Sequence, residues 1–130
     1  MKIIVTGGAG FIGSNLVDFL VKKKHKVIVI DNFSTGLKNN LKLSQNKVKI
    51  INKDISSNKN LDKIFNGVDY VFHLAGLADI VPSIEKPESY FKSNVLGTFN
   101  VLEACRKNKI KKIIYAASAS CYGLPKKFPT

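Results

Sequence analysis

Three glycines near the start of the sequence, Gly7, Gly10 and Gly13, lie three residues apart between two apolar segments. The segment before them, residues 3–6, is short and β-branched, which predicts a buried strand. In the segment after them, residues 16–20, apolar side chains recur at helical spacing. A strand, a glycine turn and a helix let the backbone approach a pyrophosphate and direct a helix N-terminus at its charge. The spacing therefore predicts a dinucleotide-binding turn.

An acidic residue supports this interpretation. Asp31 ends the next apolar segment, residues 27–30, at about the ~20-residue distance that a dinucleotide site predicts. Its carboxylate can accept hydrogen bonds from both hydroxyls of an adenosine ribose and would repel a 2′-phosphate. We therefore expect NAD rather than NADP, with Lys38 as the cation that could still favour the phosphate. The alternative is a tight turn without a ligand, which the combination of strand, helix and acid disfavours.

Length and composition predict one globular domain over residues 1–130. The hydrophobic fraction is 45%, which is ordinary for a globular chain. The sequence contains neither a long apolar run nor a signal-peptide pattern, so we expect a cytoplasmic protein without a membrane partner. Cys105 and Cys121 match no metal-ligand spacing and imply no disulfide framework, and we expect no metal.

The net charge of +12 raises the question of a nucleic-acid partner. Nearly all the excess is lysine, and Arg106 is the only arginine. The lysines are scattered along the sequence, and those at residues 22–24 lie where a helix should end and cations are favourable. Because no stacking or groove-reading motif accompanies the charge, we expect no nucleic-acid partner.

Strand-like and helix-like segments alternate along the chain. The predicted strands are residues 2–6, 26–30, 48–52, 70–74 and 112–117. The predicted helices are residues 11–23, a short helix around 61–65 and a long helix from Pro87 to the lysines at 107–109. A single helical turn is predicted within 37–43, and a loop over 123–130. This connectivity predicts an α/β fold of Rossmann type, a doubly wound parallel sheet with strand order 3-2-1-4-5.

Small or polar residues follow each predicted strand. These clusters are residues 7–13, 31–36, 54–55, 74–78 and 118–122. Because the carboxyl ends of parallel strands meet at one edge, with the ligand at the switch point between strands one and four, we expect a single site there. Asp54 could accept a hydrogen bond from an adenine amino group, or it could instead begin a turn or helix.

His73 and Ser118 are the candidates for acid–base chemistry. His73 lies one residue inside a predicted strand end, and we interpret it as packed or bonded to backbone rather than as a general base. Ser118 follows the fifth strand, where a hydroxyl beside a nicotinamide could polarise a substrate oxygen during hydride transfer. A serine or cysteine nucleophile is the alternative, but the sequence places no histidine to activate it.

Six segments, in this order, resemble motifs of the extended short-chain dehydrogenase/reductases, the nucleotide-sugar epimerase and dehydratase family. They are residues 6–14, 31–36, 54–55, 73–76, 94–98 and 118–123. Within the family the chain is most similar to the N-terminal part of the UDP-glucose 4-epimerase branch, through residues 31–33 and 118–123. The resemblance implies NAD as cofactor, a UDP-hexose as substrate, and epimerisation at C4 through a transient 4-keto sugar.

The resemblance also implies which residues form the site. The pyrophosphate would meet Gly7, Gly10, Phe11, Ile12 and Gly13; the ribose would meet Asp31, Asn32, Phe33, Ser34, Thr35 and Gly36; the adenine would meet Asp54 and Ile55. The cofactor would be lined by Leu74, Ala75, Gly76 and Ala78, with Ser93 or Asn94 near the nicotinamide. Ser118 would be the catalytic hydroxyl, and Ser118 and Ser120 would contact substrate. The family often has lysine in place of Ala78, so the resemblance implies one phosphate contact fewer in this chain.

The family's proton-transfer pair is a tyrosine and a lysine one turn apart on a helix after strand five. The literal match is Tyr122 and Lys126, but Gly123 and Pro125 would break that helix. We therefore expect the pair beyond Thr130, in a longer, homodimeric enzyme that also supplies the last strands and the sugar-binding part. This chain alone should bind NAD weakly and be inactive. The alternatives are a nucleotide-sugar 4,6-dehydratase and a non-catalytic NAD-binding module.

Overall fold

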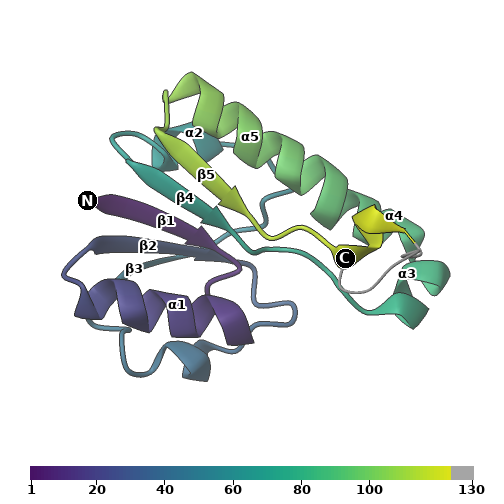
Figure 1. The fold of residues 1–130 in the computed structure, drawn as a ribbon, viewed down its shortest axis with the longest axis horizontal. Coiled ribbons are helices and arrows are strands. Elements are labelled where there is room, and N and C mark those ends of the chain that lie inside the picture. The colour runs from purple at the N-terminus through teal and green to yellow at the C-terminus, as the bar shows by residue number, and fades with distance from the viewer. Residues whose placement is uncertain (124–130) are drawn as a thin grey trace.

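The structure, a computed structural model, describes residues 1–123, excluding the side chains of Ala119 and Ser120. It contains a 5-stranded parallel sheet with the order β3-β2-β1-β4-β5 (Figure 1). The strands are β1 (Lys2–Thr6), β2 (Lys26–Asp31), β3 (Lys49–Asn52), β4 (Tyr70–His73) and β5 (Lys112–Tyr115). The predicted fold class and strand order are confirmed.

Helices cover both faces of the sheet. On one face lies α1 (Phe11–Lys22) with the short helix η1 (Lys38–Leu41), and on the other lie α2 (Leu61–Ile64) and α5 (Gly97–Lys107) (Figure 1). Alternate residues of β1 supply the two cores, because successive side chains of a strand point to opposite faces. Ile3 and Val5 pack on the α1 side, while Ile4 packs on the α5 side. None of the helices described in residues 1–123 is long and apolar enough to cross a membrane.

The long helix predicted from Pro87 spans the predicted residues, but it is not one regular α-helix. It consists of α4 (Pro87–Tyr90), a π-helical segment η2 (Phe91–Leu96) and α5. A further helix, α3 (Ile80–Glu85), precedes it and was not predicted; none of its residues is buried. Apolar spacing could not reveal either feature, because α3 has no buried face and a π turn shifts the helical period only locally.

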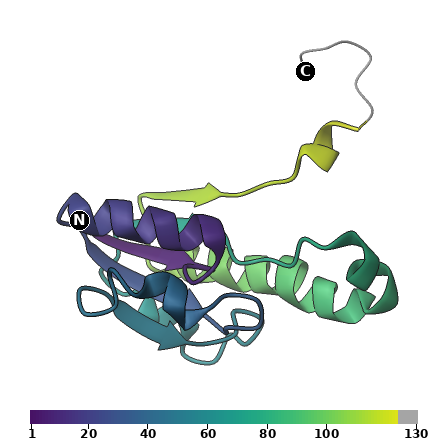
Figure 2. The same cartoon turned by 90° about the horizontal axis from the view of Figure 1, so that it is seen from below.

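The chain leaves the sheet after Tyr115, two residues earlier than predicted. Figure 2 shows the segment after β5 leading away from the rest of the molecule toward η3 (Ala119–Tyr122). The loop predicted for residues 123–130 lies, apart from Gly123, outside the described residues.

Gly7 allows the two central strands to end in close contact. It has φ +67°, and a Cβ atom built on it would lie 2.6 Å from the backbone nitrogen of Ala75, the second residue after β4. Gly67 has the same φ of +67°, but its nearest neighbour is the Nζ of Lys2 at 3.9 Å. Gly7 is therefore required both for its backbone conformation and for space, and Gly67 only for its conformation.

We expect Gly7→Ala to destabilise the protein by about 3 kcal/mol or more. The cost of holding an alanine in the left-handed conformation adds to the cost of its clash with the backbone of Ala75. Gly67→Ala, the matched control, should cost only about 1 kcal/mol. Urea unfolding of both variants measures the difference. Equal losses would show that the contact between Gly7 and Ala75 relaxes without cost.

Candidate functional site

A cleft lies at the carboxyl edge of the sheet, between the glycine turn and the segments that follow β2, β3 and β4. Within the turn, the Gly7 N–H donates to the Ile30 carbonyl at 2.8 Å, and the Gly10 N–H donates to the Gly7 carbonyl at 3.1 Å. Gly10 is the N-cap of α1, and neither a capping side chain nor an acidic residue occupies the first turn. Because the first N–H groups of a helix have no intrahelical partner, this end of α1 offers donors to an anion.

Asp31 connects the glycine turn to the loop after β2. Its side chain lines the cleft, although only 8% of the residue is exposed. The Ala9 N–H donates to Oδ2 and the Phe33 N–H donates to Oδ1, each at 2.8 Å. Because each carboxylate oxygen can accept more than one hydrogen bond, Asp31 keeps acceptor capacity for a ligand.

Asp54 follows β3 and lines the same cleft. The Asn32 Nδ2 donates to its Oδ2 at 3.0 Å, and the Ser56 N–H donates to its Oδ1 at 2.8 Å. Burial raises the pKa of Asp54, but the hydrogen bonds from Ser56 and Asn32 and the charge of Lys53 outweigh it, so the pKa is lowered overall. Asp54 therefore begins a turn, as one sequence-based alternative expected, and it also lines the cleft; its contact with an adenine stays a prediction.

A second cleft lies on the other side of the segment after β4. Residues 74–77 line both clefts and form the wall between them. Ala78, Asn94 and Ser118 line the second cleft, beside the exposed end of β5. The two clefts together extend along the carboxyl edge from Asp31 to Ser118.

His73 is fully buried beneath this wall. Thr6 Oγ1 lies 2.7 Å from its Nδ1, Thr98 Oγ1 lies 2.9 Å from its Nε2, and the ring stacks on Tyr115 with centroids 5.5 Å apart. The Ala75 N–H donates to the same Thr6 hydroxyl at 3.3 Å. Burial lowers the pKa of His73 to about 4, so the ring is neutral near pH 7. His73 is therefore packed in the interior, as one of the two sequence-based alternatives expected, and its two threonine partners tie β1, β4 and α5 together.

Asn94 holds the wall from the helix side. Its Oδ1 accepts a hydrogen bond from the Leu77 N–H, and its Nδ2 donates to the Leu77 carbonyl, each at 2.8 Å. Asn94 lies within the π-helical segment η2. Ser93, one residue earlier, lines the first cleft with Asp31, whereas Asn94 lines the second with Ser118. From the sequence we expected Ser93 or Asn94 near the nicotinamide. Of these two residues, the structure places only Asn94 on the second cleft, with Ser118.

Most residues that the sequence assigned to the cofactor come together in the first cleft, although they come from the carboxyl ends of four strands, the loops that follow them, and η2. They are Gly7, Gly10, Asp31, Asn32, Ser34, Thr35, Gly36, Asp54, Ile55, Leu74, Ala75, Gly76 and Ser93.

A few predicted residues lie outside that lining. Phe11 and Ile12 stand in the first turn of α1, with 84% and 68% of each residue exposed, so only their backbone is suited to the cleft. Gly13 packs on the turn itself, because a Cβ atom there would lie 2.2 Å from the Gly7 carbonyl oxygen. Phe33 packs against the core on the α1 side.

The catalytic candidates are only partly described. Ser118 lines the second cleft and is exposed. Tyr122 lies in η3 and is 81% exposed. The side chain of Ser120 and all of Lys126 lie outside the described part of the chain, so the expected absence of a tyrosine–lysine pair here stays a prediction.

Lys53 is the charged residue of the first cleft that sequence reasoning missed. It lines the first cleft between β3 and Asp54, and its Nζ donates to the Lys59 carbonyl at 2.7 Å. Its position directly after a predicted strand was the signal that could have found it.

The first cleft fits a dinucleotide. Unpartnered N–H groups at the start of α1 suit a pyrophosphate, and the spare acceptor capacity of Asp31 suits a ribose. The segment after β3 adds the apolar side chain of Ile55 and the carboxylate of Asp54. These donors and acceptors match the chemistry of NAD.

Comparisons with known proteins agree with this geometry. The model of the NAD dependent epimerase/dehydratase family matches residues 3–130. The chain is 43% identical to a putative UDP-glucose 4-epimerase of Methanocaldococcus jannaschii, over 98% of this chain and 41% of that protein. A crystal structure of UDP-glucose 4-epimerase with UDP-glucose from Thermotoga maritima superposes with a TM-score of 0.93 at 38% identity, over 100% of this chain and 42% of that one. The Bifidobacterium longum enzyme, in complex with NAD+ and UDP, gives 0.91 at 34% identity, over 100% and 41%.

The chain therefore belongs to the NAD dependent epimerase/dehydratase family. This confirms the family resemblance, and it confirms NAD as the cofactor at the level of the family. The chain spans about 40% of the length of the relatives that it matches.

We expect His73→Gln to change how stability depends on pH. The folded pKa of His73, about 4, lies below the ordinary value of 6.5, so the unfolded chain binds a proton first as the pH falls. This contribution to stability is complete above the ordinary pKa and is lost as the pH falls toward the folded one. Between about pH 7 and about pH 5 the wild-type protein should lose about 2 kcal/mol that the variant does not lose. Urea unfolding at both pH values measures this, and parallel losses would contradict a buried neutral ring.

We expect Asn94→Ala to loosen the wall between the clefts, because both hydrogen bonds to Leu77 are lost. The amide hydrogen of Leu77 should exchange with solvent roughly tenfold faster or more. Asn15→Ala is the control, since it removes only an exposed hydrogen bond to Phe11 on α1. Unchanged exchange at Leu77 in Asn94→Ala would show that other contacts hold the wall.

Proposed function

We propose that this chain is the cofactor-binding part of an NAD-dependent epimerase that acts at C4 of a UDP-hexose. The observation that carries the proposal is the alignment of the glycine turn, Asp31 and Ser118 along one edge of the sheet. The 43% identity to a putative UDP-glucose 4-epimerase supports the choice of reaction. The rest of the intact enzyme would supply the tyrosine–lysine pair and the sugar-binding part.

The first cleft would hold the adenosine diphosphate half of the cofactor. The glycine turn and the backbone of Phe11 and Ile12 would bind the pyrophosphate, and Asp31 would accept hydrogen bonds from the ribose hydroxyls. The carboxylate of Asp31 would repel a 2′-phosphate, so the site should prefer NAD to NADP.

The second cleft would hold the reacting groups. A bound NAD would supply the acceptor and donor of the hydride that is exchanged at the sugar C4. The Ser118 hydroxyl would hold the oxygen on that carbon and polarise it. Asn94 and Thr6 fasten the wall between the clefts, and would thereby fix the position of the reacting centre relative to the adenosine half.

The intact enzyme is proposed to act as a homodimer through the helix from Pro87. Apolar side chains on η2 and α5 support this, because Phe91, Val95, Phe99 and Leu102 are all about half exposed. They recur at helical spacing, as on a helix that packs against a partner.

Calorimetric titration of the purified protein with NAD and with NADP tests the cofactor site. We expect saturable NAD binding, NADP binding weaker by at least ~100-fold, and loss of NAD affinity by ~100-fold or more in Asp31→Ala, because hydrogen bonds to a charged group are lost. Asp62→Ala removes an exposed carboxylate far from the cleft lining and should keep wild-type affinity.

Circular dichroism of each variant separates a binding defect from unfolding, since Asp31 also anchors Ala9 and Phe33. A folded wild-type protein that binds neither nucleotide would contradict the proposal for this chain. Equal affinity for NAD and NADP would contradict the role of Asp31.

A further inference from the structure

The fold gathers lysines that are scattered in the sequence. Four strands begin with lysine: Lys2 in β1, Lys26 in β2, Lys49 in β3 and Lys112 in β5. In a parallel sheet all strand starts lie at one edge, so these side chains share the edge opposite the cofactor clefts. Lys2 and Lys26 are direct partners in the register, on strands about 4.8 Å apart.

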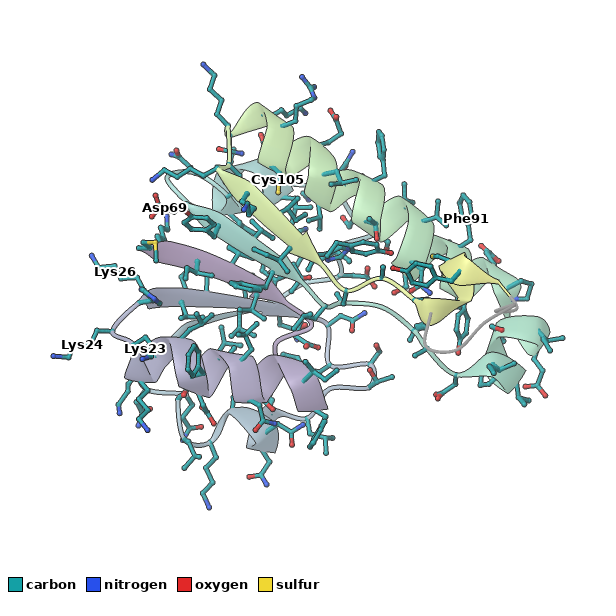
Figure 3. The ribbon with its side chains drawn as sticks, viewed as in Figure 1. Lys23, Lys24, Lys26, Asp69, Phe91 and Cys105 are labelled. Carbon is teal, nitrogen blue, oxygen red and sulfur yellow. The ribbon has the colours of Figure 1, made fainter. Side chains whose placement is uncertain are left out.

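The helix ends add further charge to the same edge. Residues 22–24 end α1 just before β2, and Lys109 follows α5 just before β5. Figure 3 shows Lys23, Lys24 and Lys26 extending from the end of the molecule where the strands begin, and Phe91 at the opposite end. We call the set of Lys2, Lys26, Lys49, Lys112, residues 22–24 and Lys109 the lysine edge.

Acidic side chains do not balance this charge. Among the described residues, Asp69 pairs with Lys111 at 2.7 Å and also accepts the backbone N–H of Lys2. Asp62 lies close by, because its carbonyl accepts a hydrogen bond from Asn108. Asp31 and Asp54 lie at the opposite edge. Much of the net charge of +12 is therefore concentrated away from the clefts.

Folding explains only part of this arrangement. Cations at helix C-termini are favourable, which accounts for residues 22–24 and Lys109. Yet Lys24 and Lys109 have φ values of +62° and +51°, a conformation in which glycine is favoured. Among the strand-start lysines, the Lys2 Nζ donates to the Asn66 carbonyl at 2.6 Å and so has a structural partner. Lys2 and Lys26 lie directly opposite each other on neighbouring strands, where like charges repel. An external anion would compensate this repulsion.

We propose that the lysine edge is a docking surface for an anionic phospholipid membrane. Lysine clusters bind such surfaces through charge, with little demand on geometry. Two exposed apolar side chains accompany the cluster: Met1 is 59% exposed, and Phe19, 55% exposed, has the Lys23 Nζ 5.6 Å from its ring centre. Such side chains enter the headgroup region of a membrane. The expectation of no membrane partner rested on the lack of a spanning segment, and peripheral docking needs none.

A nucleic acid suits this edge less well. The only arginine, Arg106, forms an ion pair with Glu103. Its guanidinium, the planar group that recognises phosphates and bases, is therefore already engaged. Single strands bind in grooves with several stacking aromatics, whereas the clefts that hold Asp31, Asp54 and Ser118 open at the other edge. Docking through the lysine edge would also leave those clefts facing the solution.

Sedimentation with lipid vesicles tests the proposal on the purified protein. We expect binding to vesicles of phosphatidylglycerol mixed with phosphatidylcholine, little binding to phosphatidylcholine alone, and weaker binding as salt is raised. Lys23→Gln/Lys26→Gln/Lys24→Gln should lower the affinity on the order of 100-fold, at roughly fivefold for each lysine. The control Lys38→Gln/Lys59→Gln/Lys86→Gln removes the same charge from other exposed sites and should bind nearly as wild type.

Three results would overturn the proposal. Equal sedimentation with neutral and anionic vesicles would remove the role of charge. Equal losses in the two triple variants would show that net charge acts and the edge does not. Tighter binding of a single-stranded RNA oligonucleotide than of the vesicles, lost in the same edge variant, would assign the edge to nucleic acid instead.

Discussion

The close approach of β1 and β4 at their carboxyl ends is the constraint on which the rest of the molecule depends. Gly7 has no side chain at the point where the backbone of Ala75 passes. Thr6, the residue before it, accepts the Ala75 N–H and bonds His73. With these contacts in place the chain turns away from the sheet on both strands, and the space between the departing segments becomes the cleft. The same contacts thus stabilise the sheet and open the site.

Much of the fold and of the first cleft was predictable because the signals are local. A strand followed by spaced glycines, and Asp31 at a strand end, are patterns within a few residues, and parallel topology then brings the clusters to one edge. The partners of His73 were not predictable in this way. Thr6 lies 67 residues away in sequence and Thr98 lies 25 residues away, so only the register of β4 and the packing of α5 bring them together.

Ser93 and Asn94 illustrate a second limit on what the sequence alone can predict about the site. Sequence spacing treats neighbouring residues of a helix as alternatives for one site. The π-helical segment η2 places Ser93 on one cleft and Asn94 on the other, with Asn94 spanning the backbone of Leu77. The lysine edge shows the same limit on a larger scale. Its lysines are scattered along the sequence, and only the parallel sheet brings them to one edge of the molecule.

The long sequence separation within the central strand pair has a consequence for folding. Pairing β1 with β2 closes a short loop, whereas pairing β1 with β4 requires a much longer loop to close, which is slower and costs more chain entropy. The half of the sheet formed by β1, β2 and β3 can therefore assemble before β4 docks. Until that late step there is no wall at residues 74–77 and hence no complete cleft. A ligand of the cleft would recognise only the finished fold, and would act on stability by holding the last contact closed.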